Sequence, residues 1–316
     1  MQLILNLGAD VDSRFIVVAY AGRSLAPHRI ANERSAIKMW LRSVPRGSRL
    51  AMESTGDYHE LLATMAQKAG LQVFVINPRD LRRYAEGVGR RGKTDRTDAE
   101  VIARYVEREH AELHAYLAPS KAQRTLQRLI ARRATLVKTR GSIVQSLRGM
   151  SSLQREISAL IARLDRLIEQ LESLMQQALK RLPHAHRTAQ HIATVPGFGT
   201  LSSTCLAHSF TRLPYGNGDA VIASTGLDPR PADSGQKRGR RRLSKRGPAE
   251  QRRLLFNCGR SAARMKIWRP YYQAQLAKGL SATAATIILA RKMVRIAFAL
   301  HKQGRSFDPA CLHVRA

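Results

Sequence analysis

An apolar run that ends on an acid opens the chain. Residues 3–10 read Leu-Ile-Leu-Asn-Leu-Gly-Ala-Asp, the composition of a strand buried on both faces, with Asp10 at its end. Residues 49–53, Arg-Leu-Ala-Met-Glu, repeat this pattern and end on Glu53. Functional groups collect at the carboxyl ends of strands in parallel sheets, so both acids are candidate site residues. Taken singly, either could be a loop acid that caps the next element.

Helices and further strands are predicted around these two runs. The apolar spacing predicts strands at residues 14–20, 27–30 and 73–76 and helices at residues 31–44, 58–68 and 80–85. Strands that alternate with helices indicate an α/β sheet with a parallel part.

Two more acids lie in the stretch Gly-Lys-Thr-Asp-Arg-Thr-Asp-Ala-Glu at residues 92–100. Thr94 is a predicted N-cap for a helix that runs to about Tyr105, on which Asp95 and Asp98 share one face. The ordinary alternative is a first turn whose acids interact with the helix dipole. Beside Asp10 and Glu53, however, four carboxylates would suit one or two Mg²⁺ ions and an in-line displacement at phosphorus.

Residues 87–94 satisfy the phosphate-binding pattern G-x-x-x-x-G-K-[ST]. A nucleotide-binding loop of this kind follows a buried strand directly, whereas Gly87 follows a predicted helix. We therefore do not predict ATP or GTP binding, and favour a basic, Gly-rich loop over a phosphate backbone.

The charge indicates a polyanionic partner. Lys and Arg total 54 against 23 Asp and Glu, a net charge of +31, while 44% apolar residues argue for a folded chain.

No run is apolar enough to span a membrane and no signal-peptide pattern is present, so a cytoplasmic location is expected. Three cysteines far apart, without a C-x-x-C pair, predict neither a disulfide framework nor a cysteine zinc site.

A helical arm is predicted between residues 120 and 180. Its second half repeats apolar residues in 3-4 alternation, the pattern of a coiled-coil seam: Ile157, Leu160, Leu164, Leu167, Leu171 and Leu174. Breaks are predicted at Gly141 and at residues 149–152. Packing within the chain and dimerisation fit this pattern equally well.

The last part of the chain starts near Pro183 and is mainly helical, with helices predicted at residues 252–264 and 282–300. Residues 195–201, Val-Pro-Gly-Phe-Gly-Thr-Leu, are similar to the turn of a helix-hairpin-helix, whose N–H groups hold a phosphate. A turn-rich loop follows at residues 226–235. Residues 230–253 contain ten Lys or Arg with few aromatics, which favours contact with a nucleic-acid backbone. The candidate contacts are Lys237, Arg238, Arg240, Arg241, Arg242, Lys245 and Arg246.

Taken in order, the motifs GADV, MESTGDYH, KTDRTDAEVIARY, INP, VPGFGT, GLDPRPADSG and an R-R-L-L helix resemble the DEDD transposases of the insertion sequence 110 type. These are also called bridge-RNA-guided recombinases, and the pilin-gene invertase is a relative. The resemblance implies a RuvC-like, RNase H-type α/β domain at residues 1–115 and a helical coiled-coil arm at residues 116–182. It further implies a mainly α C-terminal transposase domain at residues 183–316.

The resemblance also implies site residues and partners. Asp10, Glu53, Asp95 and Asp98 match the acidic tetrad that holds Mg²⁺, and Ser234 matches a serine nucleophile that forms a phosphoserine intermediate. The implied partners are donor and target DNA, a structured guide RNA encoded by the element, and further copies of the chain in a dimer or tetramer. A RuvC-like nuclease or junction resolvase, with water as nucleophile, and a non-catalytic nucleic-acid-binding protein remain as alternatives. Ser244 competes with Ser234, although a simple phosphate contact suits it better.

Overall fold

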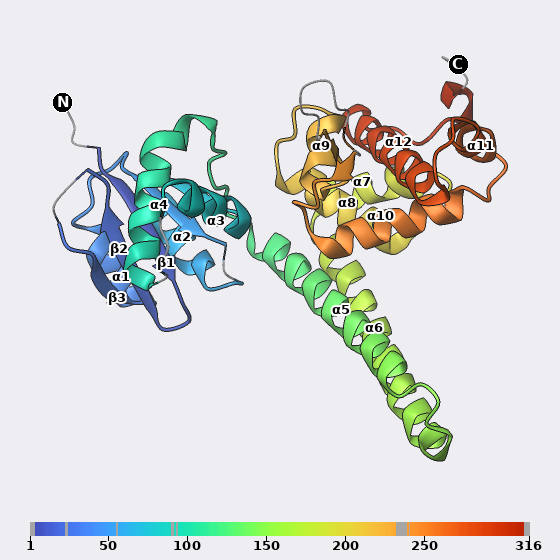
Figure 1. The fold of residues 1–316 in the computed structure, drawn as a ribbon, viewed down its shortest axis with the longest axis horizontal. Helices are drawn as coiled ribbons and strands as arrows, with labels where there is room; N and C mark the ends of the chain where they lie inside the picture. The colour runs from blue at the N-terminus through green and yellow to red at the C-terminus, as the bar shows by residue number, and fades with distance from the viewer. Residues whose placement is uncertain are drawn as a thin grey trace. The chain divides into compact units, whose positions relative to one another are not determined.

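The computed structural model describes residues 4–22, 25–54, 56–89, 92, 94–231, 239 and 241–312. The chain divides into two compact units, residues 1–118 and residues 119–316 (Figure 1). In the described part of the chain, no helix is long and apolar enough to cross a membrane.

The first unit is built on a five-stranded mixed sheet in the order β3-β2-β1-β4-β5. β2 pairs antiparallel with β1 and β3, whereas β1, β4 and β5 are parallel. The elements are β1 (Asn6–Val11), β2 (Phe15–Tyr20), β3 (His28–Ala31), α1 (Arg34–Leu41), β4 (Arg49–Glu53), α2 (His59–Lys68), β5 (Gln72–Ile76), α3 (Pro78–Gly87) and α4 (Asp95–Glu109). Leu7, Leu50 and Met52 pack with residues of α1 and α2 on one face of the sheet. The predicted α/β sheet with a parallel part is therefore confirmed.

α4 covers the opposite face of the sheet (Figure 1) and reaches it through a row of small residues. Gly8 of β1 pairs with Ala19 of β2 and with Ala51 of β4. Ala99 and Ala103 of α4 are fully buried against this row. A Cβ on Gly8 would overlap the main chain of α4, because the Cα of Ala103 lies only 2.8 Å from that position. Glycine is thus required for the helix to lie directly on the central strand.

Two predicted helix boundaries in this unit are corrected by the structure. α1 begins at Arg34 and not at residue 31, because Ala31 pairs with Phe15 in the β2–β3 ladder. α3 begins at Pro78, with the Asn77 side chain accepting a hydrogen bond from the Arg79 N–H as its N-cap.

The second unit starts with two long antiparallel helices, α5 (Lys121–Ser146) and α6 (Gln154–Lys180). Arg140 donates two hydrogen bonds to Asp165, at 2.5 and 3.0 Å, across this pair. The break predicted at Gly141 is wrong, because α5 runs through it. A glycine inside an exposed helix costs only about 1 kcal/mol relative to alanine, which the packing of α5 on α6 outweighs. The chain does turn at residues 147–153, where the second break was predicted.

The seam predicted on α6 only partly matches the contacts within the chain. Leu160, Leu167 and Leu174 are 43–46% exposed, whereas Ile168 and Met175, one residue further on, are buried. The apolar face of α6 is therefore wider than a single seam, and the described part of the chain leaves the row of Leu160, Leu167 and Leu174 (the leucine row) partly exposed.

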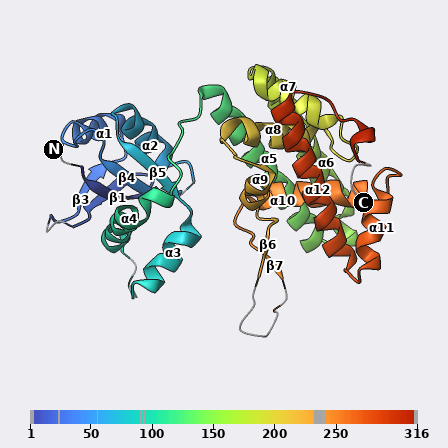
Figure 2. The same ribbon diagram turned by 90° about the horizontal axis from the view of Figure 1, so that it is seen from above.

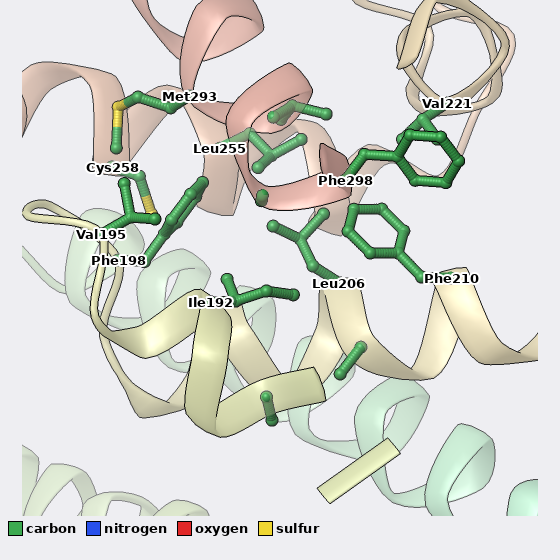
Figure 3. Packing of buried hydrophobic residues seen from close by; sticks show 14 of the residues in the cluster. Ile192, Val195, Phe198, Leu206, Phe210, Val221, Leu255, Cys258, Met293 and Phe298 are labelled. Carbon is green, nitrogen blue, oxygen red and sulfur yellow. The ribbon is translucent and has the colours of Figure 1, made fainter. Parts of the chain in front are cut away.

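The remaining helices form one core, and Figure 3 shows its centre, where Phe210 and Phe298 meet edge to face at 5.4 Å near Ile192 and Leu206. The elements are α7 (Pro183–Ala193), α8 (Thr200–Arg212), α9 (Gly218–Thr225), β6 (Pro229–Arg230), β7 (Arg242–Leu243), α10 (Ala249–Ala262), α11 (Arg269–Ala277) and α12 (Ala282–Gln303). The short 3₁₀ helices are His110–Glu112, Ser151–Leu153 and Pro309–Leu312.

The predicted tight turn between two helices joins α7 to α8. Gly197 has a φ of +102°, and Trp268 donates a hydrogen bond of 2.7 Å from Nε1 to the Pro196 carbonyl. The Gly199 N–H already donates to Ser202 Oγ at 3.0 Å. A phosphate contact at this turn stays a prediction.

Gly8→Ala is expected to destabilise the first unit by about 3 kcal/mol or more, the upper end for overpacking, since the added methyl meets backbone and not a movable side chain. Gly141→Ala is the control, because a Cβ there has nothing within 4 Å; it should stabilise α5 by about 1 kcal/mol. Urea unfolding, followed by hydrogen exchange in peptides from β1 and α5, measures both effects. An unchanged stability of Gly8→Ala would contradict the close contact of α4 with β1.

Candidate active site

Two acids occupy neighbouring strand ends on one face of the sheet. Ala9 pairs with Met52 in the parallel β1–β4 ladder, so the next residues, Asp10 and Glu53, follow side by side. Side chains alternate along a strand, and Asp10 therefore shares the face of Gly8, just as Glu53 shares the face of Ala51. This is the face that α4 covers. Both acids are half-buried.

The first turn of α4 brings two further acids to the same end of the sheet. α4 runs antiparallel to β1: Glu107 lies beside Gly22, and the neighbouring Ala21 donates a hydrogen bond to Asn6 at the start of β1. The beginning of α4 consequently lies toward the carboxyl end of β1, where Asp10 stands.

Thr94 caps this helix as predicted. Its Oγ1 accepts a hydrogen bond from the Thr97 N–H at 3.2 Å, while the Thr94 N–H donates to Thr97 Oγ1 at 3.0 Å. This reciprocal capping box fixes where the helix starts. The positions of Asp95 and Asp98 are fixed with it.

Glu53 and Asp98 line one cleft of about 500 Å³. Pro78 and Leu81 of α3 and Ile102 of α4 supply its apolar lining. Asp98 is half-buried here. Asp95, which was predicted on the same helix face, is the first residue of α4 and is exposed.

The four carboxylates supply the hard oxygen ligands that Mg²⁺ prefers. They share one face and one end of the sheet, and this arrangement suits the chemistry of such an ion. Among the residues that the structure describes, however, no three Asp, Glu, His or Cys side chains lie close enough together to hold one ion.

The nearby G-x-x-x-x-G-K-[ST] stretch lies in the wrong context for a nucleotide-binding loop. Gly87 is the last residue of helix α3 and does not follow a strand directly. Lys93 lies outside the described residues.

In the second unit, the basic stretch forms a hairpin whose two short strands, β6 and β7, pair antiparallel near α9 (Figure 2). Ser234, Lys237, Arg238 and Arg240 lie outside the described residues. The other four candidate contacts are described and exposed: Arg241, Arg242, Lys245 and Arg246.

Ser244 has a hydrogen-bond partner that no sequence pattern indicates. Its hydroxyl donates a hydrogen bond to Asp228 Oδ1, and its N–H donates to the Asp228 carbonyl at 2.9 Å. Sixteen residues separate the two. A turn-rich segment with Asp228 was visible in the sequence, yet the pairing across the hairpin follows only from the β6–β7 register.

Comparison with known proteins matches both units. A family model for the DEDD transposase domain of the IS110 type, described as "Transposase", covers residues 7–150. A second model, "Transposase IS116/IS110/IS902 family", covers residues 189–273. The chain belongs to the IS110 family of transposases. It is accordingly a DNA transposase or recombinase.

Relatives of this transposase match most of its length. The transposase for insertion sequence element IS1328 of Yersinia enterocolitica is 29% identical over 301 residues, which cover 82% of this chain and 85% of the relative. The pilin gene-inverting proteins of Moraxella bovis and Moraxella lacunata are each 26% identical over 269 residues, covering 82% of this chain and 81% of theirs.

Two cysteines of the transposase lie in the core of its second unit. Cys205 and Cys258 are free and buried in the core of the second unit. Burial raises the pKa of the Cys205 thiol to about 12, with the nearby Glu250 adding to the effect. Burial likewise raises the pKa of Cys258. Burial and a raised pKa both disfavour the reactive thiolate, so neither thiol is a candidate site residue.

Proposed function

We propose that this transposase cuts and exchanges DNA strands through a phosphoserine at Ser234, supported by Mg²⁺ at Asp10, Glu53, Asp95 and Asp98. One observation supports the acidic part of the proposal: Asp10 and Glu53 lie side by side on the face that α4 covers, and Glu53 lines a cleft with Asp98. The role of Ser234 rests on its match to the family's motif. The sheet has two antiparallel pairings, β3–β2 and β2–β1, followed by the parallel strands β1, β4 and β5, and this order supports an RNase H-type, RuvC-like domain.

The four carboxylates proposed to bind the metal differ in how exposed their side chains are. Asp10, Glu53 and Asp98 are half-buried and would become the inner ligands once an ion draws their carboxylates together, whereas Asp95 is exposed and would contribute from the start of α4. A bound Mg²⁺ would stabilise the charge that develops on the phosphate and favour deprotonation of the attacking oxygen.

The covalent step exchanges one ester bond for another. The Ser234 hydroxyl loses its proton, its Oγ forms a bond to phosphorus, and the deoxyribose oxygen leaves and takes up a proton. Attack by a deoxyribose hydroxyl of the new partner strand reverses these changes and frees the serine. The number of phosphoester bonds stays constant, so the exchange needs no nucleotide hydrolysis.

Nucleic acid would bind to the basic residues of the hairpin. Four of them are exposed at its base: Arg241, Arg242, Lys245 and Arg246. The net charge of +31 suits several long polyanions. We propose that these polyanions are donor and target DNA together with an element-encoded guide RNA.

Self-association is proposed for the arm. The leucine row of α6 presents apolar side chains at seven-residue spacing, which matches the repeat of a helical coiled-coil partner. A second copy of the chain would bury the row, giving a dimer or a tetramer.

Asp98→Asn keeps the size of the side chain but removes the charge that a hard cation requires. Recombination between donor and target plasmids should fall by about a hundredfold or more, and the rise in melting temperature on adding Mg²⁺ should disappear. Asp12→Asn is the control, because the Asp12 carboxylate accepts hydrogen bonds from the Arg14 and Phe15 N–H groups, a role that asparagine retains. Wild-type recombination in Asp98→Asn would reject the metal site.

Ser234→Ala should abolish a covalent protein–DNA adduct on a nicked substrate while DNA and RNA affinities stay unchanged. Denaturing electrophoresis detects the adduct, and mass spectrometry of the linked peptide identifies the serine. Ser224→Ala is the control, since its hydroxyl only donates to the Val221 carbonyl within α9. A peptide modified at Ser244 would reassign the nucleophile, and cleavage by water with no adduct in the wild type would establish the nuclease alternative.

Replacing Leu160 and Leu167 by Glu should weaken self-association by about tenfold or more, because two charges would enter an apolar contact. The variant Ala159→Glu with Ser173→Glu adds the same charges at exposed positions outside the leucine row and should associate normally. Sedimentation equilibrium measures both. Equal association of the two variants would place the interface elsewhere.

A further inference from the structure

Helix α5 has many cations and no acids. Its 26 residues include seven Lys or Arg, whereas no Asp or Glu occurs among them. The antiparallel helix α6 lies beside it (Figure 1) and has four residues of each charge among its 27. Charges of both signs alternate on an ordinary solvated helix, and α6 follows this rule. α5 does not, so solvation alone does not account for its charge.

The inner cations of α5 are matched by acids of other helices. The Arg133 side chain is only 11% exposed and donates to Glu172 of α6 at 2.7 Å and to Glu250 of α10 at 3.0 Å. Arg140 donates to Asp165 of α6. These pairs join α5 to its neighbours, and they direct the acids of the neighbouring helices toward the inner side of α5.

Three exposed cations form a row on the outer side of α5: Lys121, Arg128 and Arg132 (the cationic row). Their spacing of seven and four residues places them on one helix face, about 10 and 6 Å apart along the axis. Leu126, which is fully buried, lies toward the opposite side. α5 contains no aromatic residue, so it offers no platform on which unpaired bases could stack. The cationic row therefore suits the regular backbone of a duplex.

The cationic row is unfavourable for the helix itself. Arg128 and Arg132 carry like charges four residues apart, a spacing at which they repel. Lys121 and Arg124 lie in the first turn, which has no acid and where the helix dipole opposes positive charge. A sequence that departs from local rules in this way is expected where the residues serve a partner. A bound polyanion would relieve both repulsions.

We propose that the cationic row of α5 binds the phosphate backbone of duplex DNA along the arm. DNA is the partner that membership of a transposase family implies. The row is complementary in charge to that backbone, and each cation that contacts a phosphate releases bound counterions. This surface is additional to the hairpin and requires neither the serine mechanism nor the metal site.

The test is a salt titration of the affinity of the full-length transposase for a mixed-sequence DNA duplex, followed by fluorescence anisotropy. EDTA is present, so metal-dependent strand cutting does not contribute. Arg128→Gln with Arg132→Gln should flatten the slope of log affinity against log salt by about 1.8, for two contacts at about 0.9 each. Between about 50 and 200 mM salt, the wild type should then lose about twelvefold more affinity than the variant.

A matched control removes two exposed cations from the other helix of the arm. Arg163→Gln with Arg166→Gln on α6 changes the net charge equally, and the slope should stay at the wild-type value. Glutamine is about as good a helix former as arginine, so both double variants should keep the wild-type melting temperature.

A second measurement uses the wild-type chain. Acetylation of lysines by an activated ester, read by mass spectrometry, should slow at Lys121 when the duplex is bound. Lys180 at the end of α6 is exposed as well and serves as the control, whose rate should not change.

The outcomes separate this inference from the proposed function. A wild-type slope in the α5 variant, equal losses in both double variants, or an unprotected Lys121 would overturn the DNA surface and leave the serine mechanism untouched. Loss of slope with an RNA duplex but not with DNA would also overturn it, by assigning the row to RNA. Conversely, absence of a covalent adduct would reject the serine mechanism without affecting this binding result.

Discussion

The contact of α4 with β1 at Gly8 determines the geometry of the acidic site. A side chain at this position would overlap the main chain of Ala99 and Ala103, so the helix and the strand are held at a separation that only glycine permits. Asp10 lies two residues further along the same strand face, and Asp95 lies one helical turn before Ala99. The small-residue row thus sets the spacing between the acids on the sheet and the acids on the helix.

The strand ends of this site could be predicted from the sequence because the same short runs of residues indicate both a buried strand and the acid at its end. An apolar run that ends on an acid indicates both a buried strand and the end at which the acid lies, as for Asp10 and Glu53. The difference between Asp95 and Asp98 could not be predicted in the same way. Their three-residue spacing gives a shared helix face, but only the docking of α4 on the sheet decides that Asp98 lines the cleft while Asp95 is exposed.

In the arm, the structure expected from local sequence differs from the structure that tertiary packing produces. Gly141 is a poor helix residue, yet the contacts of α5 with α6, including Arg133 with Glu172 at 2.7 Å, keep the helix continuous. On α6, the predicted seam and the neighbouring Ile161, Ile168 and Met175 are all apolar, so the 3-4 pattern alone cannot say which row faces α5. The chain buries Ile168 and Met175, whereas the leucine row stays partly exposed.

The hairpin base shows why a motif residue and the contacts near it are found by different signals. Ser234 is suggested by a local motif, whereas Asp228 and Ser244 are linked only by the register of β6 with β7. Gly226 and Gly247 bring the end of α9 against the chain that follows β7, because a Cβ at either glycine would overlap backbone of the other segment. Arg252 of α10 donates hydrogen bonds to the Thr225 and Gly247 carbonyls and so joins the same two segments. These contacts connect residues that are distant in the sequence, so no local pattern indicates them and only the tertiary fold reveals which residues make them.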